Sequence, residues 1–164
     1  MISVLLVAPV SDLVWVESEI ETIVNLAGLR VRLVRRPATV RSVTEAIERS
    51  GPLDVVVFST HGNGDGLVLD DGQASIADVL MLVEMARCEL AVLNSCSSVA
   101  IANAIVKITR CDVVATIEEQ PDKRAWQVST GLLRELVRMG TPVAAFMRTA
   151  RHDDNSVYLR SLND

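Results

Sequence analysis

The chain has 164 residues, of which 49% are hydrophobic, enough for one well-packed core and too few for two ordinary domains, so we expect a single domain over residues 1–164. Its formal net charge is −5 and only 3% of its residues are aromatic, which argues against a nucleic-acid-binding surface, because such surfaces carry a basic stripe. No apolar run approaches the ~20 residues of a transmembrane helix, and no Lys or Arg precedes the apolar start of the chain, so we expect neither a membrane span nor a secretion signal.

The N-terminal part of the chain predicts a strand followed by a helix. Residues 2–8 are an apolar run typical of a buried strand. Ser11 and Asp12 follow a proline and are N-cap candidates for an amphipathic helix over residues 13–27. We expect the acidic residues of this helix, Glu19 among them, on its exposed face.

The same alternation of strands and helices continues to the end of the chain. Residues 29–34 alternate apolar and basic side chains, which is typical of a strand near the edge of a sheet. A second helix over residues 39–50 is capped by Thr39 or Ser42. The later predictions are strands over residues 55–58, 89–94 and 112–117, a hairpin over 67–74, helices over 75–87, 97–109 and 125–139, a last helix ending near 151, and an edge strand over 157–159.

Two of these strands end on chemically reactive side chains. The apolar run over residues 55–58 leads to His61, and the run over residues 90–93 leads to Cys96. Continuous apolar runs are typical of strands buried on both faces of a parallel sheet, and ligands bind beyond the carboxyl ends of such strands. If the two strands are neighbours, an imidazole and a thiol meet in one crevice, which would make a catalytic pair.

The cysteines are Cys88, Cys96 and Cys111. Their odd number and the lack of a CxxC pair argue against a disulfide framework and against a zinc site. A reducing, cytoplasmic compartment suits such thiols best, and we expect no metal ion and no other cofactor. Cys88 and Cys111 stand near the starts of strands, so we interpret them as structural.

An ordered set of motifs resembles the core of a CHAT domain, a family of bacterial caspase-like cysteine peptidases of clan CD. The strand that leads to His61 continues into a glycine loop over residues 62–66 and a short apolar turn, and the next strand ends in Asn94-Ser95-Cys96-Ser97-Ser98. The resemblance covers roughly residues 50–151. Further family features correspond to Val113, Val114, Ala115, Thr116, Asp122, Ala125, Gly140, Ala144, Ala145 and Ala150.

The resemblance implies a fold that agrees with the βα alternation. We expect an α/β three-layer sandwich with a mostly parallel, caspase-like sheet and helices on both faces. The implied order of strands, numbered along the chain without the hairpin, is 2-1-3-4-5, with a possible sixth strand at the edge.

The resemblance also implies the chemistry of a cysteine peptidase. Cys96 would be the nucleophile and His61 the general acid and base. The backbone N–H groups of Gly62 and Cys96 would form the oxyanion hole. Cys96 would lie at a helix N-terminus, where the helix dipole favours the thiolate. The resemblance requires no third catalytic residue.

Substrate preference is open at this point. The acidic residues Asp12, Glu118, Glu119 and Asp122 all follow strands at the expected substrate end of the sheet. A carboxylate at the bottom of the first specificity pocket would select Arg or Lys, whereas solvated loop acids would select nothing. The sequence departs from the family at Glu118-Glu119, where an aromatic-containing segment is usual, and at Ser97, where an acidic residue is frequent.

The resemblance implies a protease effector of a bacterial defence or signalling system, with a protein or peptide as substrate and an activating protein acting in trans. A homodimer through the helix that carries Met81 and Met85 is possible on composition. The alternatives are a catalytically silent caspase-like interaction module and a flavodoxin-like or receiver-like signalling domain. A flavodoxin-like or receiver-like domain would need an acidic cluster after the first strand, and Ser11-Asp12 matches such a cluster poorly.

Overall fold

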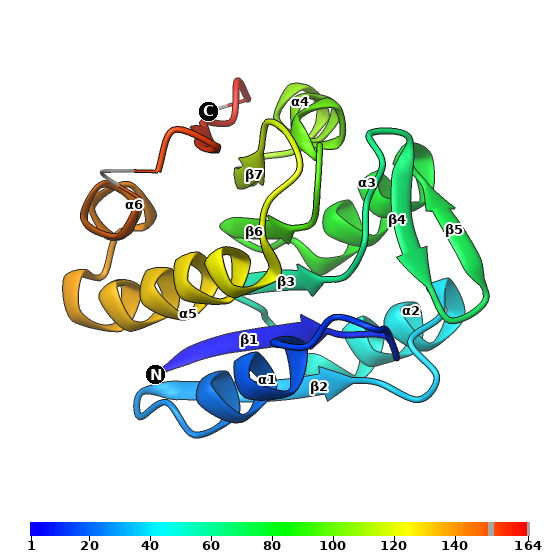
Figure 1. The fold of residues 1–164 in the computed structure, drawn as a ribbon, viewed down its shortest axis with the longest axis horizontal. Helices are drawn as coiled ribbons and strands as arrows, with labels where there is room; N and C mark the ends of the chain where they lie inside the picture. Colours follow the sequence, from blue (N-terminus) through cyan, green and yellow to red (C-terminus); the bar gives the residue numbers. More distant parts are fainter. Residues whose placement is uncertain (151–152, 164) are drawn as a thin grey trace.

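The computed structural model describes residues 1–150 and 153–163, and its centre is a six-stranded sheet in the order β2-β1-β3-β6-β7-β8 (Figure 1). All pairs in this sheet are parallel except the edge pair β7–β8. The expected order and the edge strand are therefore confirmed. The strands are β1 (Ile2–Val7), β2 (Leu29–Val34), β3 (Val55–Ser59), β6 (Leu90–Asn94), β7 (Asp112–Thr116) and β8 (Ser156–Leu159).

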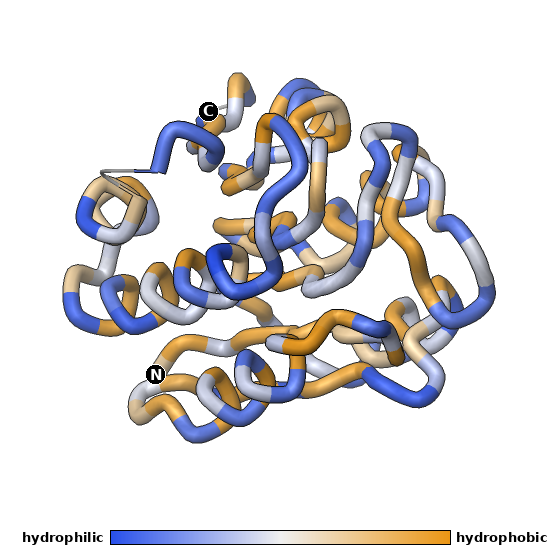
Figure 2. The backbone as a smooth tube through the Cα atoms, viewed as in Figure 1, coloured by the Kyte–Doolittle hydropathy of each residue, from blue (hydrophilic) through white to orange (hydrophobic). Residues whose placement is uncertain are grey.

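Helices cover both faces of the sheet, which explains the continuous apolar runs in its central strands. In β1, Leu5 packs into the core on one face and Leu6 into the core on the other. Apolar residues are accordingly concentrated along the strands in Figure 2. One layer contains α2 (Val40–Ser50), α3 (Ile76–Ala86) and α4 (Val99–Ile108), and the other contains α1 (Val16–Val24), α5 (Asp122–Met139) and α6 (Pro142–Thr149).

A hairpin stands at the end of the sheet to which β1 and β3 point (Figure 1). It consists of β4 (Gly66–Leu69) and β5 (Gly72–Ser75). The hairpin is joined to the segment after β3, because Val68 N–H donates to the carbonyl of His61 at 2.9 Å. The side chain of Leu67, in β4, is fully buried. The hairpin thereby fixes the backbone on which His61 stands.

Helix boundaries agree with the predicted caps in two cases and differ in a third. Thr39 and Ser42 cap α2 together, and Ser75 caps α3. The expectation that Ser11 or Asp12 caps the first helix is wrong, because α1 begins only at Val16.

The expectation that Glu19 is exposed is also wrong. Glu19 lies three residues after Val16 and four before Ile23, so it shares their buried helical face and is only 2% exposed. The predicted end of the last helix near Arg151 falls outside the described residues, and α6 is described to Thr149. No helix in the described part of the chain combines the length and apolar character needed to cross a membrane.

Candidate active site

His61 and Cys96 occupy equivalent positions after two neighbouring strands. In the parallel pair β3–β6, Ser59 lies opposite Asn94, and His61 and Cys96 each follow two residues later. The Thr60 N–H extends the ladder by donating to the Asn94 carbonyl at 3.4 Å. His61 and Cys96 line the same pocket, which is partly open to solvent.

Gly62 lies directly against the backbone of Cys96. A Cβ atom on Gly62 would be 2.8 Å from the carbonyl oxygen of Cys96 and 3.1 Å from the hydroxyl oxygen of Ser95. Only glycine allows the two loops to approach this closely. The N–H groups of Gly62 and Cys96 donate to no acceptor among the described residues.

The turn that carries Cys96 is held by the end of β7. Ser97 has a left-handed backbone, with φ of 52°, which is uncommon for a residue with a side chain. Its N–H donates to the carbonyl of Glu118 at 3.2 Å. The Ser98 hydroxyl accepts from the Thr116 N–H at 3.0 Å, and Ser98 is the N-cap of α4. Cys96 therefore lies two residues before the cap of the helix, on a tightly constrained turn.

Asp12 contacts the imidazole of His61. The distance between Asp12 Oδ1 and His61 Nε2 is 2.7 Å, and this hydrogen bond holds the pKa of the Asp12 carboxyl below its usual value. Sequence reasoning nominated no third residue beside the catalytic pair. Asp12 follows β1, the strand next to β3, so its place in the loop was the available signal.

Glu19 brings a buried carboxyl to the pocket from α1. Its Oε1 accepts from Asn94 Nδ2 at 2.8 Å and from the hydroxyl of Ser129 on α5. Burial raises the pKa of Glu19 to about 7, against the effect of these hydrogen bonds, and the neighbouring carboxylate of Asp122 raises it further. Sequence reasoning missed this residue, although its helical spacing from Val16 was a signal for burial.

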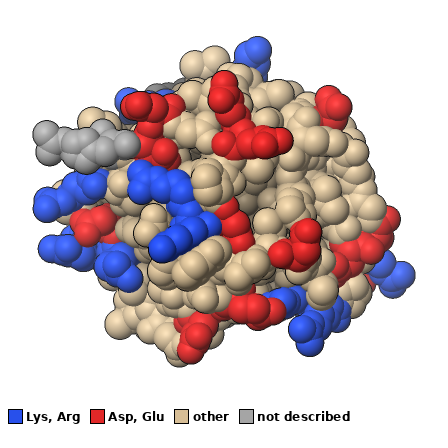
Figure 3. Space-filling view, in the orientation of Figure 1, with Lys and Arg blue, Asp and Glu red and all other residues tan. Residues whose placement is uncertain are grey.

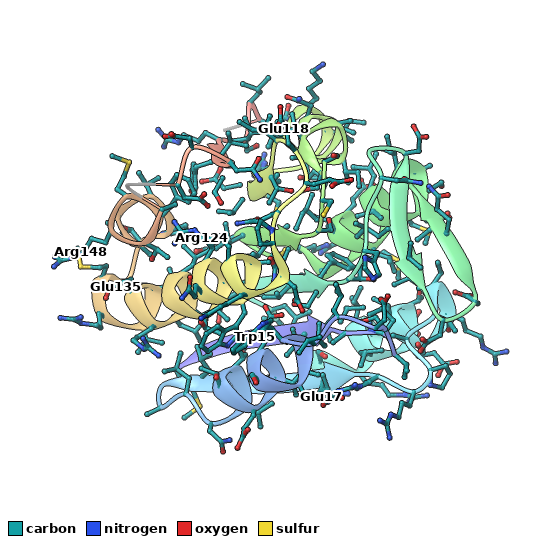
Figure 4. The ribbon with its side chains drawn as sticks, viewed as in Figure 1. Trp15, Glu17, Glu118, Arg124, Glu135 and Arg148 are labelled. Atoms are coloured by element: carbon teal, nitrogen blue, oxygen red, sulfur yellow. The ribbon has the colours of Figure 1, made fainter. Side chains whose placement is uncertain are left out.

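The other predicted acidic residues are divided between the pocket and the surface. Asp122 lines the pocket, and its Oδ2 accepts from the N–H of Trp15 at 2.7 Å. Glu118 and Glu119 lie exposed in the loop between β7 and α5, and neither lines the pocket. Glu118 lies beside α4 in Figure 4.

A pair of tryptophans holds the start of α1 against α5. The ring centroids of Trp15 and Trp126 are 5.1 Å apart in a stacked arrangement, and Trp15 lies between the two helices in Figure 4. Lys123 lies over the Trp15 ring, with its Nζ 5.4 Å from the centroid. These contacts fix the two helices that contribute Glu19 and Asp122 to the pocket.

Cys88 and Cys111 stand away from this pocket. Both are buried, and their sulfur atoms are 3.5 Å apart. Cys88 lies two residues before the start of β6, and Cys111 lies directly before β7. The hydrogen bond to Cys88 and burial raise the pKa of the Cys111 thiol, which keeps it neutral. Among the described residues, no group of three His, Cys, Asp or Glu side chains could hold a metal ion.

Comparisons with known proteins give a family and a shared fold for this chain. The family model of the CHAT domain matches residues 6–153. A solved structure of a secreted C11 cysteine protease from Bacteroides thetaiotaomicron, in complex with an irreversible peptide inhibitor, is similar with a TM-score of 0.67 and 12% identity. That likeness covers 90% of this chain but 56% of the other, and at this identity it shows a shared fold. A search of curated proteins found no match.

Proposed function

The chain belongs to the CHAT domain family, and we propose that it is a cysteine endopeptidase in which Cys96 is the nucleophile and His61 the general acid and base. The observation that carries the proposal is the register of β3 and β6, which brings His61 and Cys96 to one pocket. The fold shared with a cysteine protease supports it. We also propose that residues 1–164 act as one peptidase domain.

In the first step, His61 removes the proton of the Cys96 thiol, and the sulfur forms a bond to the carbonyl carbon of the substrate. The carbonyl electrons move to the oxygen, which the N–H groups of Gly62 and Cys96 stabilise. The carbon–nitrogen bond then breaks as His61 returns the proton to the leaving amine. A water molecule, deprotonated by His61, attacks the thioester, and release of the acid restores the Cys96 thiol.

Asp12 acts as a positioning residue in this scheme. An imidazole that donates its Nε2 hydrogen to Asp12 has Nδ1 free to accept the proton of the Cys96 thiol. The carboxylate also stabilises the imidazolium that forms when His61 takes the proton. The interaction is exposed to solvent, so we expect its contribution to be modest.

The biological role follows the family resemblance. We propose an effector of a bacterial defence or signalling system that an activating protein switches on in trans. Mixing the chain with the products of neighbouring genes tests this part of the proposal, because peptidase activity should rise with one of them and stay at its basal level with the others.

Hydrolysis of a peptide library tests the peptidase proposal itself. Mass spectrometry should find new peptide termini with the wild-type chain, and activity should fall at least about 10³-fold in Cys96→Ala and about 10²-fold or more in His61→Ala. Equal cleavage by the wild type and Cys96→Ala would refute the assignment of the nucleophile. A chain that cleaves nothing but binds partners equally well after Cys96→Ala would be a silent interaction module.

A further inference from the structure

The pocket beside Cys96 is acidic. Glu19 and Asp122 line it from two different helices, and among the described lining residues there is no Lys or Arg. On the face shown in Figure 3, basic side chains gather over α5 and α6, while acidic ones are spread over the middle and right of the view. Among the basic residues on that side are Arg138 and Arg148, both of which pair with Glu135, outside the pocket. The described lining of the pocket therefore holds two carboxyl groups and no basic side chain that could neutralise them.

Two buried hydroxyl groups in the same pocket have no partner. Ser59 is 1% exposed and Ser95 is 6% exposed, and neither hydroxyl oxygen makes a hydrogen bond within the described part of the chain. A buried hydroxyl without a partner is costly and is found where a ligand or a water molecule supplies the missing bond.

The chemistry of these groups selects among substrate side chains. A carboxylate accompanied by hydroxyl acceptors suits an ammonium or guanidinium group, which only donates hydrogen bonds. It disfavours an aliphatic side chain, which would leave the Glu19 carboxylate without a counter-charge and both hydroxyls without partners, and it repels an acidic one. Asn94 and Ser129 hold the Glu19 carboxyl in place by donating to it, so the acceptor is preorganised.

We propose that this pocket receives the substrate residue on the amino side of the cleaved bond, and that Glu19 makes the enzyme select lysine or arginine there. The inference rests on the proposed peptidase function, because the pocket adjoins Cys96 and His61. It differs from the sequence-based hypothesis in the residue that acts. The loop acids Glu118 and Glu119 do not line the pocket, whereas Glu19 on α1 does.

Labelling with peptidyl acyloxymethyl ketones tests the inference. These electrophiles alkylate the catalytic thiol, and the panel carries Lys, Arg, norleucine, Leu or Asp next to the ketone. Norleucine matches the length of lysine without its charge, so the ratio of the Lys and norleucine rates isolates the charge. We expect the wild type at pH 8, where the Glu19 carboxyl is mostly ionised, to react about 10- to 100-fold faster with the Lys or the Arg probe than with the norleucine probe, as one charge-assisted hydrogen bond allows.

Glu19→Gln keeps the size of the side chain and removes its charge, so the preference should fall to within about threefold. Glu17→Gln is a matched control two residues away. Glu17 is exposed and pairs with Arg35 outside the pocket, so this variant should keep the wild-type ratio.

The outcomes separate the inference from the proposed function. Labelling of Cys96 at equal rates by the Lys and norleucine probes, or a lysine preference retained in Glu19→Gln, would overturn the inference and leave the peptidase proposal intact. The ratio of the Lys and norleucine labelling rates of the wild type tests the inference even if Glu19→Gln does not fold.

Failure of every probe to label the chain, both alone and mixed with the products of neighbouring genes, would contradict the proposed function, and binding would then decide the inference. Nα-acetyl-lysine amide should bind the wild type in ligand-observed NMR, whereas Nα-acetyl-norleucine amide should not. Lysine amide that does not bind, or binds Glu19→Gln equally well, would overturn the inference.

Discussion

Replacing Glu19 with glutamine gives the chain a different dependence of stability on pH. In the folded protein, burial raises the pKa of Glu19 from 4.5 to about 7, because the desolvated site disfavours the charged form. In the unfolded chain the carboxyl titrates near its ordinary value. A carboxyl whose folded-state pKa is raised contributes its full stability at low pH and loses it as pH rises through the folded-state pKa.

The magnitude follows from this difference in pKa. A rise from 4.5 to about 7 corresponds to about 3 kcal/mol in total, most of which is lost between pH 5 and pH 8. Glutamine does not titrate, so it removes this loss. Asp122, His61 and Cys96 also line the pocket, but they are present in both proteins, so the difference between wild type and variant isolates Glu19 to first order.

Urea unfolding at pH 5 and pH 8 measures the effect. The free energy of unfolding of the wild type, minus that of Glu19→Gln, should fall by roughly 2 to 3 kcal/mol between the two pH values. The control Glu17→Gln should show no such change, since its hydrogen bond with Arg35 lowers the pKa of Glu17 and its titration lies below this pH window. If the free energies of unfolding of wild type and Glu19→Gln differ by the same amount at both pH values, the pKa of Glu19 is not raised in the folded protein.

Three further predictions concern the loops around the pocket. Gly62→Ala should lower kcat about 100-fold, because its Cβ would be 2.8 Å from the carbonyl of Cys96 and would displace the oxyanion donors; a kcat within twofold of wild type would contradict this. Asp12→Asn should lower kcat about fivefold and leave KM unchanged, since Asp12 contacts His61 and does not line the pocket; a raised KM with unchanged kcat would point to substrate binding instead. Ser97→Val should lower the free energy of unfolding by about 1–2 kcal/mol, measured in urea, whereas Ser97→Gly should not, because the backbone of Ser97 is left-handed.

The sheet could be predicted from the sequence because its signals are local. The central strands are continuous apolar runs, since side chains of β1 such as Leu5 and Leu6 enter cores on opposite faces. The helix caps at Thr39 and Ser75 could be predicted because capping residues interact within one turn of the helix. The pairing of β3 with β6 needed the family resemblance as well.

The surroundings of the catalytic pair could not be predicted in the same way, because they depend on contacts between distant segments. Asp12 meets His61 across 49 positions of sequence, and Ser129 meets Glu19 across 110. Without those partners, an Asp after a proline is a plausible helix cap and a Glu in a charged helix is plausibly exposed. The late start of α1 at Val16 leaves Asp12 in the loop before the helix.

The proposed function depends first on Cys96 being the catalytic nucleophile. The most direct measurement is intact-mass and peptide mapping after reaction with a mixture of peptidyl acyloxymethyl ketones. We expect one adduct, on Cys96, that is absent in Cys96→Ala, while the buried thiols of Cys88 and Cys111 remain unmodified. Modification of Cys88 or Cys111 in preference to Cys96, or equal labelling of Cys96→Ala, would contradict it.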